Sequence, residues 1–324
     1  MMTRRILAAA SFAAIAILAA PPAEAEVPGP LVAPAWLAEQ PAGSVVVLDV
    51  REDPEAFEKA PGRIAGALPV SFKDLRGSRT IDGQEVTRLS LTAEGFQDLM
   101  RGHGVDDGET VVVTWPGDSA IGLTAAAYLY WQAKLYGHDD VAILDGGTAA
   151  WAASGRTLTQ DAPADPQPGT FTAAAARDDL LATMDEVEAA MQGGPQLVDA
   201  RPLALYIGLA APPYVFKKGH IPGADLLPFP FLTQAVGGKA GTDGGAAEPV
   251  RMVVHEPETL RRIATDLDVD LSGAAISYCN SGRTSASAWF VLNEVLGVPT
   301  QLYDGSMHAW TLDPQRPVAT ALAE

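Results

Sequence analysis

An internal repeat is the feature that most constrains the fold of this chain. Four short segments recur in the same order in the two halves, and at Asp49, Gly62 and Asp145 the offsets to the matching residues are 150, 157 and 159. A repeat of this length indicates two copies of one domain. The matched segments are Leu48 to Arg51 with Val198 to Arg201, Gly62 to Ala67 with Gly219 to Ala224, Val111 to Trp115 with Ala275 to Cys279, and Leu144 to Gly147 with Tyr303 to Ser306.

Each copy has the pattern of an α/β domain. A short apolar strand, a glycine-rich turn, a helical stretch and another apolar strand follow one another, which favours a mainly parallel sheet flanked by helices. We expect the first domain at residues 27–160 and the second at 170–324. The segment 161–169 contains three prolines and is typical of a linker.

The first 25 residues have the pattern of a secretory signal. Arg4 and Arg5 precede an apolar stretch over 6–20, and a small-x-small cleavage pattern follows at 23–25. A membrane anchor is the alternative, but Pro21 and Pro22 end the apolar stretch short of the roughly 20 residues that a spanning helix needs. We expect cleavage, no membrane association of the mature chain, and a periplasmic location if the source is a Gram-negative bacterium.

The charge of the chain restricts its partners. The formal net charge is -18 at pH 7, from 22 Lys and Arg against 40 Asp and Glu. Nucleic acid and anionic lipid surfaces require clustered positive charge, so neither is expected as a partner. An anionic substrate would have to be attracted by local donors.

The chain contains one cysteine, Cys279, which cannot form an internal disulfide. A lone cysteine is often only a small buried hydrophobe, but this one follows an apolar run over 274–278 that predicts a strand. A helical pattern over 284–296 comes next. Cys279 is therefore expected in a loop at the start of a helix, where amide groups and the helix dipole lower a thiol pKa. Gly282 permits a tight curl. Thr284 and Ser285 are expected as helix caps whose hydroxyls can also donate hydrogen bonds into the loop.

Four motifs together resemble the rhodanese family. They are Asp-x-Arg, Gly-His-Ile-Pro-Gly-Ala, Cys-x-x-Gly-x-Thr and Asp-Gly-x-x-x-x-Trp, and the resemblance covers nearly the whole mature chain. It implies two tandem rhodanese-like domains, of which the first is catalytically silent and the second carries the cysteine. Trp115 stands where the first copy would have its cysteine, which fits that arrangement.

The resemblance also implies a reaction. Cys279 would take a sulfane sulfur from a small anionic donor, thiosulfate or 3-mercaptopyruvate, and pass it from a persulfide to a thiol or cyanide. No metal or organic cofactor is expected. The backbone N–H groups of the loop would hold the charge of the persulfide, so its residues are the expected substrate-binding set: Asn280, Ser281, Gly282, Arg283 and Thr284.

The chain departs from the family pattern at two places. Leu205 occupies the position where thiosulfate sulfurtransferases usually place a substrate-binding arginine, and the pair Asn280-Ser281 is closer to mercaptopyruvate-type loops. The donor therefore stays open between the two. We expect Arg283 to supply the missing charge, with Lys217 and Lys218 as weaker candidates.

Other polar residues have a simpler interpretation. Asp199 and Arg201 are expected to form a structural ion pair, and His220 belongs to a turn motif shaped by its glycines and proline. Trp289 and Trp310 are expected in the core. His308 lies near the expected active loop, so a functional role stays open beside a structural one.

The alternatives to a sulfurtransferase are a cysteine phosphatase, a cysteine hydrolase and a non-enzymatic module. A cysteine phosphatase requires Cys-x5-Arg, but the sixth residue after Cys279 is Ser285. A cysteine hydrolase needs a histidine base, and the spacing of His220, His255 and His308 supports none. The third alternative is a non-enzymatic module that binds a partner or senses oxidants through Cys279.

Overall fold

The computed structural model describes residues 26–81, 83–238 and 250–321. The expected signal peptide, residues 1–25, lies outside them. In the described part of the chain, no helix combines the length and apolar character needed to cross a membrane.

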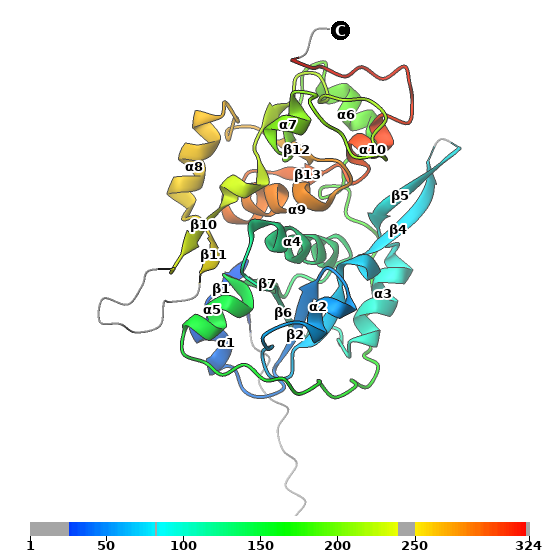
Figure 1. The fold of residues 1–324 in the computed structure, drawn as a ribbon. Helices are drawn as coiled ribbons and strands as arrows, with labels where there is room; N and C mark the ends of the chain where they lie inside the picture. The colour runs from blue at the N-terminus through cyan, green and yellow to red at the C-terminus, as the bar shows by residue number, and fades with distance from the viewer. Residues whose placement is uncertain (1–25, 82, 239–249, 322–324) are drawn as a thin grey trace, which may run out of the picture.

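The first half is built on a five-stranded parallel sheet with the strand order β1-β7-β6-β2-β3. Helices flank this sheet (Figure 1). The elements are β1 (Leu31–Val32), α1 (Pro34–Glu39), β2 (Val45–Arg51), α2 (Pro54–Glu58), β3 (Leu68–Ser71), the 3-10 helix η1 (Phe72–Leu75), β4 (Arg76–Ile81), β5 (Gln84–Ser90), α3 (Ala93–Gly102), β6 (Thr110–Thr114), α4 (Ala120–Leu135), β7 (Val141–Leu144) and α5 (Gly147–Ala153).

The second half contains a four-stranded parallel sheet with the order β13-β12-β8-β9. Two tandem α/β units with mainly parallel sheets are thus confirmed. The elements are α6 (Met184–Ala190), β8 (Gln196–Asp199), α7 (Leu203–Tyr206), β9 (Asp225–Leu226), the 3-10 helix η2 (Phe229–Leu232), β10 (Thr233–Val236), β11 (Arg251–Val254), α8 (Pro257–Asp266), β12 (Ala275–Tyr278), α9 (Arg283–Trp289), the π-helix η3 (Phe290–Val295), β13 (Thr300–Leu302) and α10 (Ser306–Trp310).

The central strands are apolar because helices cover both faces of each sheet. Every residue of β6 and of β12 is buried, as expected of a parallel sheet that has no solvent-exposed face. The segment between the halves, from 160 to 183, forms no helix or named strand. It is fastened to the first half by backbone hydrogen bonds such as Phe171 N–H to Val105 O at 3.1 Å. The proline-rich stretch 161–169 lies inside this segment.

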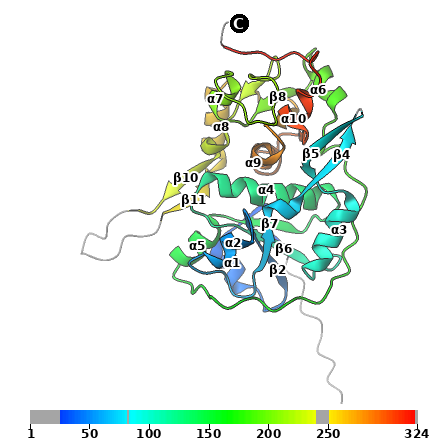
Figure 2. The ribbon, with the colours of Figure 1, turned by 45° about the vertical axis from the view of Figure 1, so that its right-hand side comes forward.

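Helices α4 and α9 lie against each other where the two halves meet, and both views place them between the two sheets (Figures 1 and 2). Most of α4 is buried, because one side faces its own sheet and the other faces the second half. The ring of Tyr130 meets that of Phe290 edge to face, with centroids 5.0 Å apart. One hydrophobic core cluster contains residues of both halves.

Each half has one antiparallel hairpin that contacts the other half. In β4–β5, Ser90 N–H donates to Asp304 Oδ2 of the second half at 2.6 Å. In β10–β11, Val254 N–H donates to Asp145 Oδ1 of the first half at 2.9 Å. Asp145 and Asp304 are matching residues of the repeat, so the two hairpins make reciprocal contacts.

Candidate active site

Cys279 lies between a strand and a helix, as the sequence pattern predicts. β12 ends at Tyr278 and α9 begins at Arg283, so the cysteine opens the loop at the carboxyl end of an inner strand. Ligands of parallel α/β sheets bind at this end of the strands. Cys279 is only 2% exposed, so little water reaches its sulfur.

The helix after the loop differs in two details from the expectation. The cap of α9 is Gly282, whereas Thr284 and Ser285 lie within its first turn, so the prediction that these two residues cap the helix was wrong. After Trp289 the α-helix continues as the π-helix η3. Gly282 has φ of 84°, and a Cβ there would lie 2.2 Å from Asp304 Oδ1. Only glycine fits this position without displacing its neighbours.

Ser306 binds both ends of the loop 279–282, which we call the cysteine loop. Its hydroxyl oxygen accepts hydrogen bonds from Cys279 N–H at 3.0 Å and Gly282 N–H at 3.1 Å, and the hydroxyl donates to Tyr303 O at 2.8 Å. Ser306 is fully buried and has φ of 49°, which is strained for a residue with a side chain. The matching residue of the first half is Gly147, with φ of 56°.

Hydrogen bonds stabilise the thiolate of Cys279. Burial raises the pKa of the thiol, but hydrogen bonds from the side chains of Ser285 and Thr284 and from the backbone N–H groups of Ser285 and Ser281 outweigh it, so the pKa lies below its ordinary value. Ser285 Oγ is 3.5 Å from Cys279 Sγ. The sulfur is thus favoured in its nucleophilic form.

Asp199 and Arg201 form a buried ion pair, with Nη2 2.6 Å from Oδ2. Arg201 also donates to Gly219 O at 2.8 Å and to Asn280 Oδ1 at 3.3 Å. The pair has the structural role that we expected, and in addition it positions the side chain that follows the cysteine.

Arg283 is directed toward the first half of the chain. Its guanidinium donates to Thr124 Oγ1 at 3.0 Å and to both carboxylate oxygens of Glu52, and it lies 4.3 Å from the ring centroid of Phe72. The positive charge of Arg283 is therefore already paired. This pairing argues against the expectation that Arg283 replaces the arginine missing at Leu205.

Of the two lysine candidates, Lys217 is bound elsewhere. Lys217 Nζ donates to the carbonyls of Pro314 and Arg316 at 2.5 and 2.6 Å. Lys218 is exposed, and Leu205 belongs to the short helix α7.

The two histidines of the family motifs differ in their surroundings. His220 stacks on Tyr206 with ring centroids 3.7 Å apart and contacts Tyr206 O through Nδ1. His308 is buried beside the cysteine loop, where its backbone N–H donates to Asn280 O at 2.9 Å. Its ring nitrogens contact Tyr214 O at 2.7 Å and Thr87 Oγ1 at 3.3 Å. Burial lowers the pKa of His308, so its neutral form is favoured.

The comparison with protein families identifies both halves. The rhodanese-like domain matches twice, at residues 33–154 and at 183–313, and the two matches cover more than half of the chain. The chain belongs to the rhodanese family.

Two curated relatives of this rhodanese are named "Putative thiosulfate sulfurtransferase". The protein of Haloferax volcanii is 33% identical over 280 residues, which cover 84% of this chain and 87% of the relative. That of Saccharopolyspora erythraea is 32% identical over 274 residues, which cover 82% of this chain and 86% of the relative. These relatives support sulfur transfer as the class of reaction.

Two solved structures share the fold. SseA from Escherichia coli, described as a 3-mercaptopyruvate sulfotransferase, has a TM-score of 0.69 and 25% identity, and the match covers 86% of this chain and 98% of SseA. The anaerobic ergothioneine biosynthesis enzyme of Chlorobium limicola has a TM-score of 0.73 and 22% identity, with 91% of this chain and 71% of that enzyme covered. The second likeness shows the fold alone.

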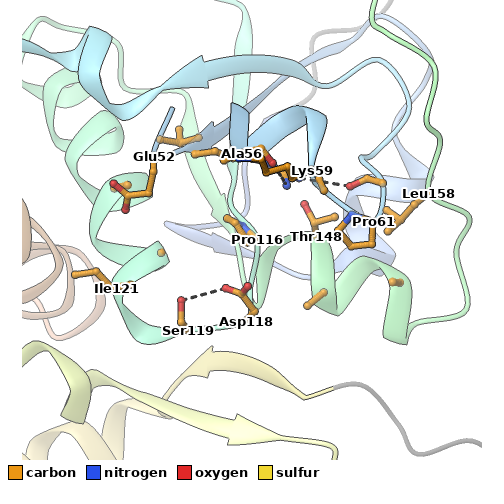
Figure 3. Close-up of a pocket in the computed structure, with 18 residues that line it drawn as sticks. Glu52, Ala56, Lys59, Pro61, Pro116, Asp118, Ser119, Ile121, Thr148 and Leu158 are labelled. Atoms are coloured by element: carbon orange, nitrogen blue, oxygen red, sulfur yellow. Dashed lines mark hydrogen bonds between the residues drawn. The ribbon is translucent and has the colours of Figure 1, made fainter. Parts of the chain in front are cut away.

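The first rhodanese-like half has a cavity at the place that matches the Cys279 loop of the second half. Trp115 takes the place of the cysteine and is fully buried against Gly122, and Ala149 stands at the position that matches His308. A cavity of about 590 Å³, lined by Glu52, Pro116, Ile121, Thr148 and others, opens there (Figure 3). A tryptophan cannot act as a sulfur nucleophile, so this half contains no counterpart of Cys279.

Sequence reasoning missed the residues that the β4–β5 hairpin brings to the site. Arg76 donates to Ser281 O of the cysteine loop, and Thr87 contacts His308. It also missed Ser306 as a partner of the loop, whereas the hydroxyl donors Thr284 and Ser285 were expected and are confirmed. The signal for Ser306 was present, because a serine replaces the second glycine of the repeated Asp-Gly-Gly.

Proposed function

We propose that this chain is a sulfurtransferase that carries sulfane sulfur as a persulfide on Cys279. The observation that supports this most is a buried thiol whose pKa is lowered by a ring of hydroxyl and amide donors. Such donors are in place before reaction, so they stabilise negative charge without reorganisation. The names of the relatives support the same class of reaction.

In the first step the Cys279 thiolate attacks the sulfane sulfur of the donor. With thiosulfate, the S–S bond of the donor breaks, its electron pair leaves with sulfite, and a Cys279 persulfide anion forms. With 3-mercaptopyruvate, the C–S bond breaks and the carbon takes a proton to give pyruvate. In the second step a thiolate or cyanide attacks the outer sulfur, and Cys279 leaves as a thiolate.

The cysteine loop is the proposed binding site of the transferred sulfur. The backbone N–H groups of Asn280, Ser281, Arg283 and Thr284 hold the persulfide charge, and Thr284 adds its hydroxyl. The N–H group of Gly282 is not among them, because it donates to Ser306 Oγ. Arg201 fixes the side chain of Asn280, and Ser306 fixes the loop ends. In this scheme Arg283 anchors the loop to Glu52 of the first half.

Thiosulfate is the favoured donor, because the curated relatives that are more than 30% identical carry thiosulfate in their names. The structural relative SseA, at 25% identity, points to 3-mercaptopyruvate. Comparing kcat/KM for the two donors decides between them, and a higher value for 3-mercaptopyruvate overturns this preference.

Mass spectrometry of the intact protein tests the persulfide. After incubation with donor and removal of the excess, we expect a gain of about 32 Da, one sulfur atom, that cyanide or dithiothreitol removes. Cys279→Ser is the control and gains nothing. No adduct with either donor, together with no thiocyanate production, contradicts sulfur transfer and favours a module that binds a partner or senses oxidants.

We further propose that residues 1–25 direct export and that the mature protein acts in the periplasm. The basic start, apolar stretch and Ala23-Glu24-Ala25 support this. Sequencing the amino terminus of the protein from a periplasmic extract should give Glu26 first. Recovery of the uncleaved chain in the cytoplasm contradicts it.

A further inference from the structure

Two arginines of the β4–β5 hairpin lack an acidic partner in a strongly acidic chain. Within the described residues, no carboxylate lies within ion-pair distance of Arg76 or Arg88, whereas Arg79 of the same hairpin is 3.7 Å from Asp304. The hairpin extends along the second half (Figures 1 and 2). Its unpaired positive charges therefore lie beside the half that contains Cys279.

Arg76 joins the hairpin to the cysteine loop. Through Nη2 it donates to the carbonyls of Arg88 and Ser281. Its guanidinium also lies 4.7 Å from the ring centroid of Tyr128. Nη1 is buried and has no hydrogen-bond partner. A buried, charged N–H group without a partner is rare, because leaving it unsatisfied costs more than an ordinary hydrogen bond returns. It is an unsatisfied donor next to the loop.

Arg88 is held in an uncommon backbone conformation. It has φ of 63°, near the register shift of the hairpin, and its exposed guanidinium lies over the ring of Tyr214 at 4.4 Å. The carbonyl of Tyr214 contacts His308, whose backbone binds Asn280. Burial lowers the pKa of His308, and the charges of Arg88 and Arg76 lower it further, so both charges lie near the residue that binds Asn280.

We propose that Arg76 and Arg88 form the binding site for the oxyanion group of the sulfur donor. The shared chemistry is a sulfonate-like or carboxylate group, the charged end of thiosulfate or of 3-mercaptopyruvate. The inference rests on the proposed function. It explains how the chain binds an anion although Leu205 stands at the usual arginine position, Arg283 is paired with Glu52 and Lys217 is bound to carbonyls. The first half thus supplies the charge and the second half the sulfur.

Equilibrium binding to the full chain with Cys279→Ser tests the site without turnover. We compare this protein with two double variants that add Arg88→Gln or Arg262→Gln, and titrate each by calorimetry with thiosulfate and with 3-mercaptopyruvate. Arg262 is an exposed arginine on α8 and controls for the change of net charge. Arg88→Gln should raise the Kd about tenfold, as expected for the loss of a charge-assisted hydrogen bond. Arg262→Gln should leave it unchanged.

The two donors separate the outcomes. Weaker binding of both supports a general oxyanion site, and weaker binding of one supports the site and identifies its donor. Equal affinities of the Arg88→Gln and Arg262→Gln proteins overturn the inference. If wild-type protein forms no persulfide but the affinity depends on Arg88, the proposed function fails and the anion site stands.

Arg76→Lys tests the second arginine, because lysine keeps the charge but lacks the forked geometry. In the Cys279→Ser chain we expect a Kd several-fold higher. A lower urea midpoint with an unchanged Kd shows that Arg76 has only a structural role, and overturns its part in the site.

Discussion

The sulfur of Cys279 is subject to two opposed effects. Burial disfavours a thiolate, and the hydrogen bonds of the loop and of the first turn of α9 favour it. The lowered pKa means that the donors prevail. Among the side-chain donors, Ser285 Oγ lies 3.5 Å from the sulfur, and Ser306 Oγ lies 4.0 Å from it.

Replacing Ser285 by alanine should raise the pKa of Cys279. At pH 7 a smaller fraction of the cysteine is then ionised, so alkylation by iodoacetamide should slow several-fold, and its pH profile should move to higher pH. The rate of alkylation against pH measures this. Ser287→Ala is the matched control, because Ser287 is also buried on α9 and its hydroxyl donates to Thr284 O at 2.7 Å. Identical profiles of the two variants contradict the assignment.

Ser306 combines backbone strain with two hydrogen bonds to the loop. Ser306→Gly relieves the strain at φ of 49° but loses the acceptor for Cys279 N–H and Gly282 N–H, whereas Ser306→Ala loses the acceptor and keeps the strain. We expect Ser306→Gly to be about 1–2 kcal/mol more stable than Ser306→Ala. Both should form the persulfide about tenfold more slowly than wild type. Urea unfolding and single-turnover mass spectrometry measure these effects. A variant with the wild-type rate would show that Ser306 is not needed to position the loop.

At the level of elements, the hairpins β4–β5 and β10–β11 each contact the opposite half, but their contacts are not equivalent. Asp304 accepts from Ser90 N–H and from Tyr128 OH at 2.8 Å, and Arg79 lies nearby. Its counterpart Asp145 accepts from Val254 N–H. The contacts at Asp304 attach the hairpin that carries Arg76 and Arg88 to the half that contains Cys279, whereas those at Asp145 lie in the half without the cysteine.

This inequality predicts different results for a matched pair of variants. Asp304→Asn replaces one accepting carboxylate oxygen by an amide N–H₂ group, so that one of the donors Ser90 N–H and Tyr128 OH loses its acceptor. This change should lower the free energy of unfolding by roughly 1–3 kcal/mol and loosen the β4–β5 hairpin. We expect its kcat/KM for thiosulfate to fall about tenfold. Asp145→Asn should lower the stability by about 1 kcal/mol and leave kcat/KM unchanged. Denaturant titration and steady-state kinetics test both. Equal kinetic losses would mean that the reciprocal contacts serve stability alone.

For the whole molecule, the repeat and the strand–loop–helix pattern around Cys279 sufficed to predict tandem α/β units and the position of the thiol. Both depend on short segments whose conformation is determined locally. The partners of the loop were not predictable in this way. Arg76 and Ser281 are 205 residues apart in sequence, and only the crossing of the hairpin brings them together. The pairing of Arg283 was not predictable for the same reason, because its partner Glu52 comes from the other half.

The contact between α4 and α9 should make the two halves unfold as one unit. Phe290 is fully buried against Tyr130, and the core cluster that contains both continues through each half. Phe290→Ala should lower the free energy of unfolding by about 3–5 kcal/mol. Because neither half keeps its apolar interface when the other opens, native-state hydrogen exchange should show equal losses of protection in β6 and in β12. Phe231→Ala, at a ring that is half exposed, should change neither. Loss of protection in β12 with β6 unchanged would show that the half containing Cys279 opens independently.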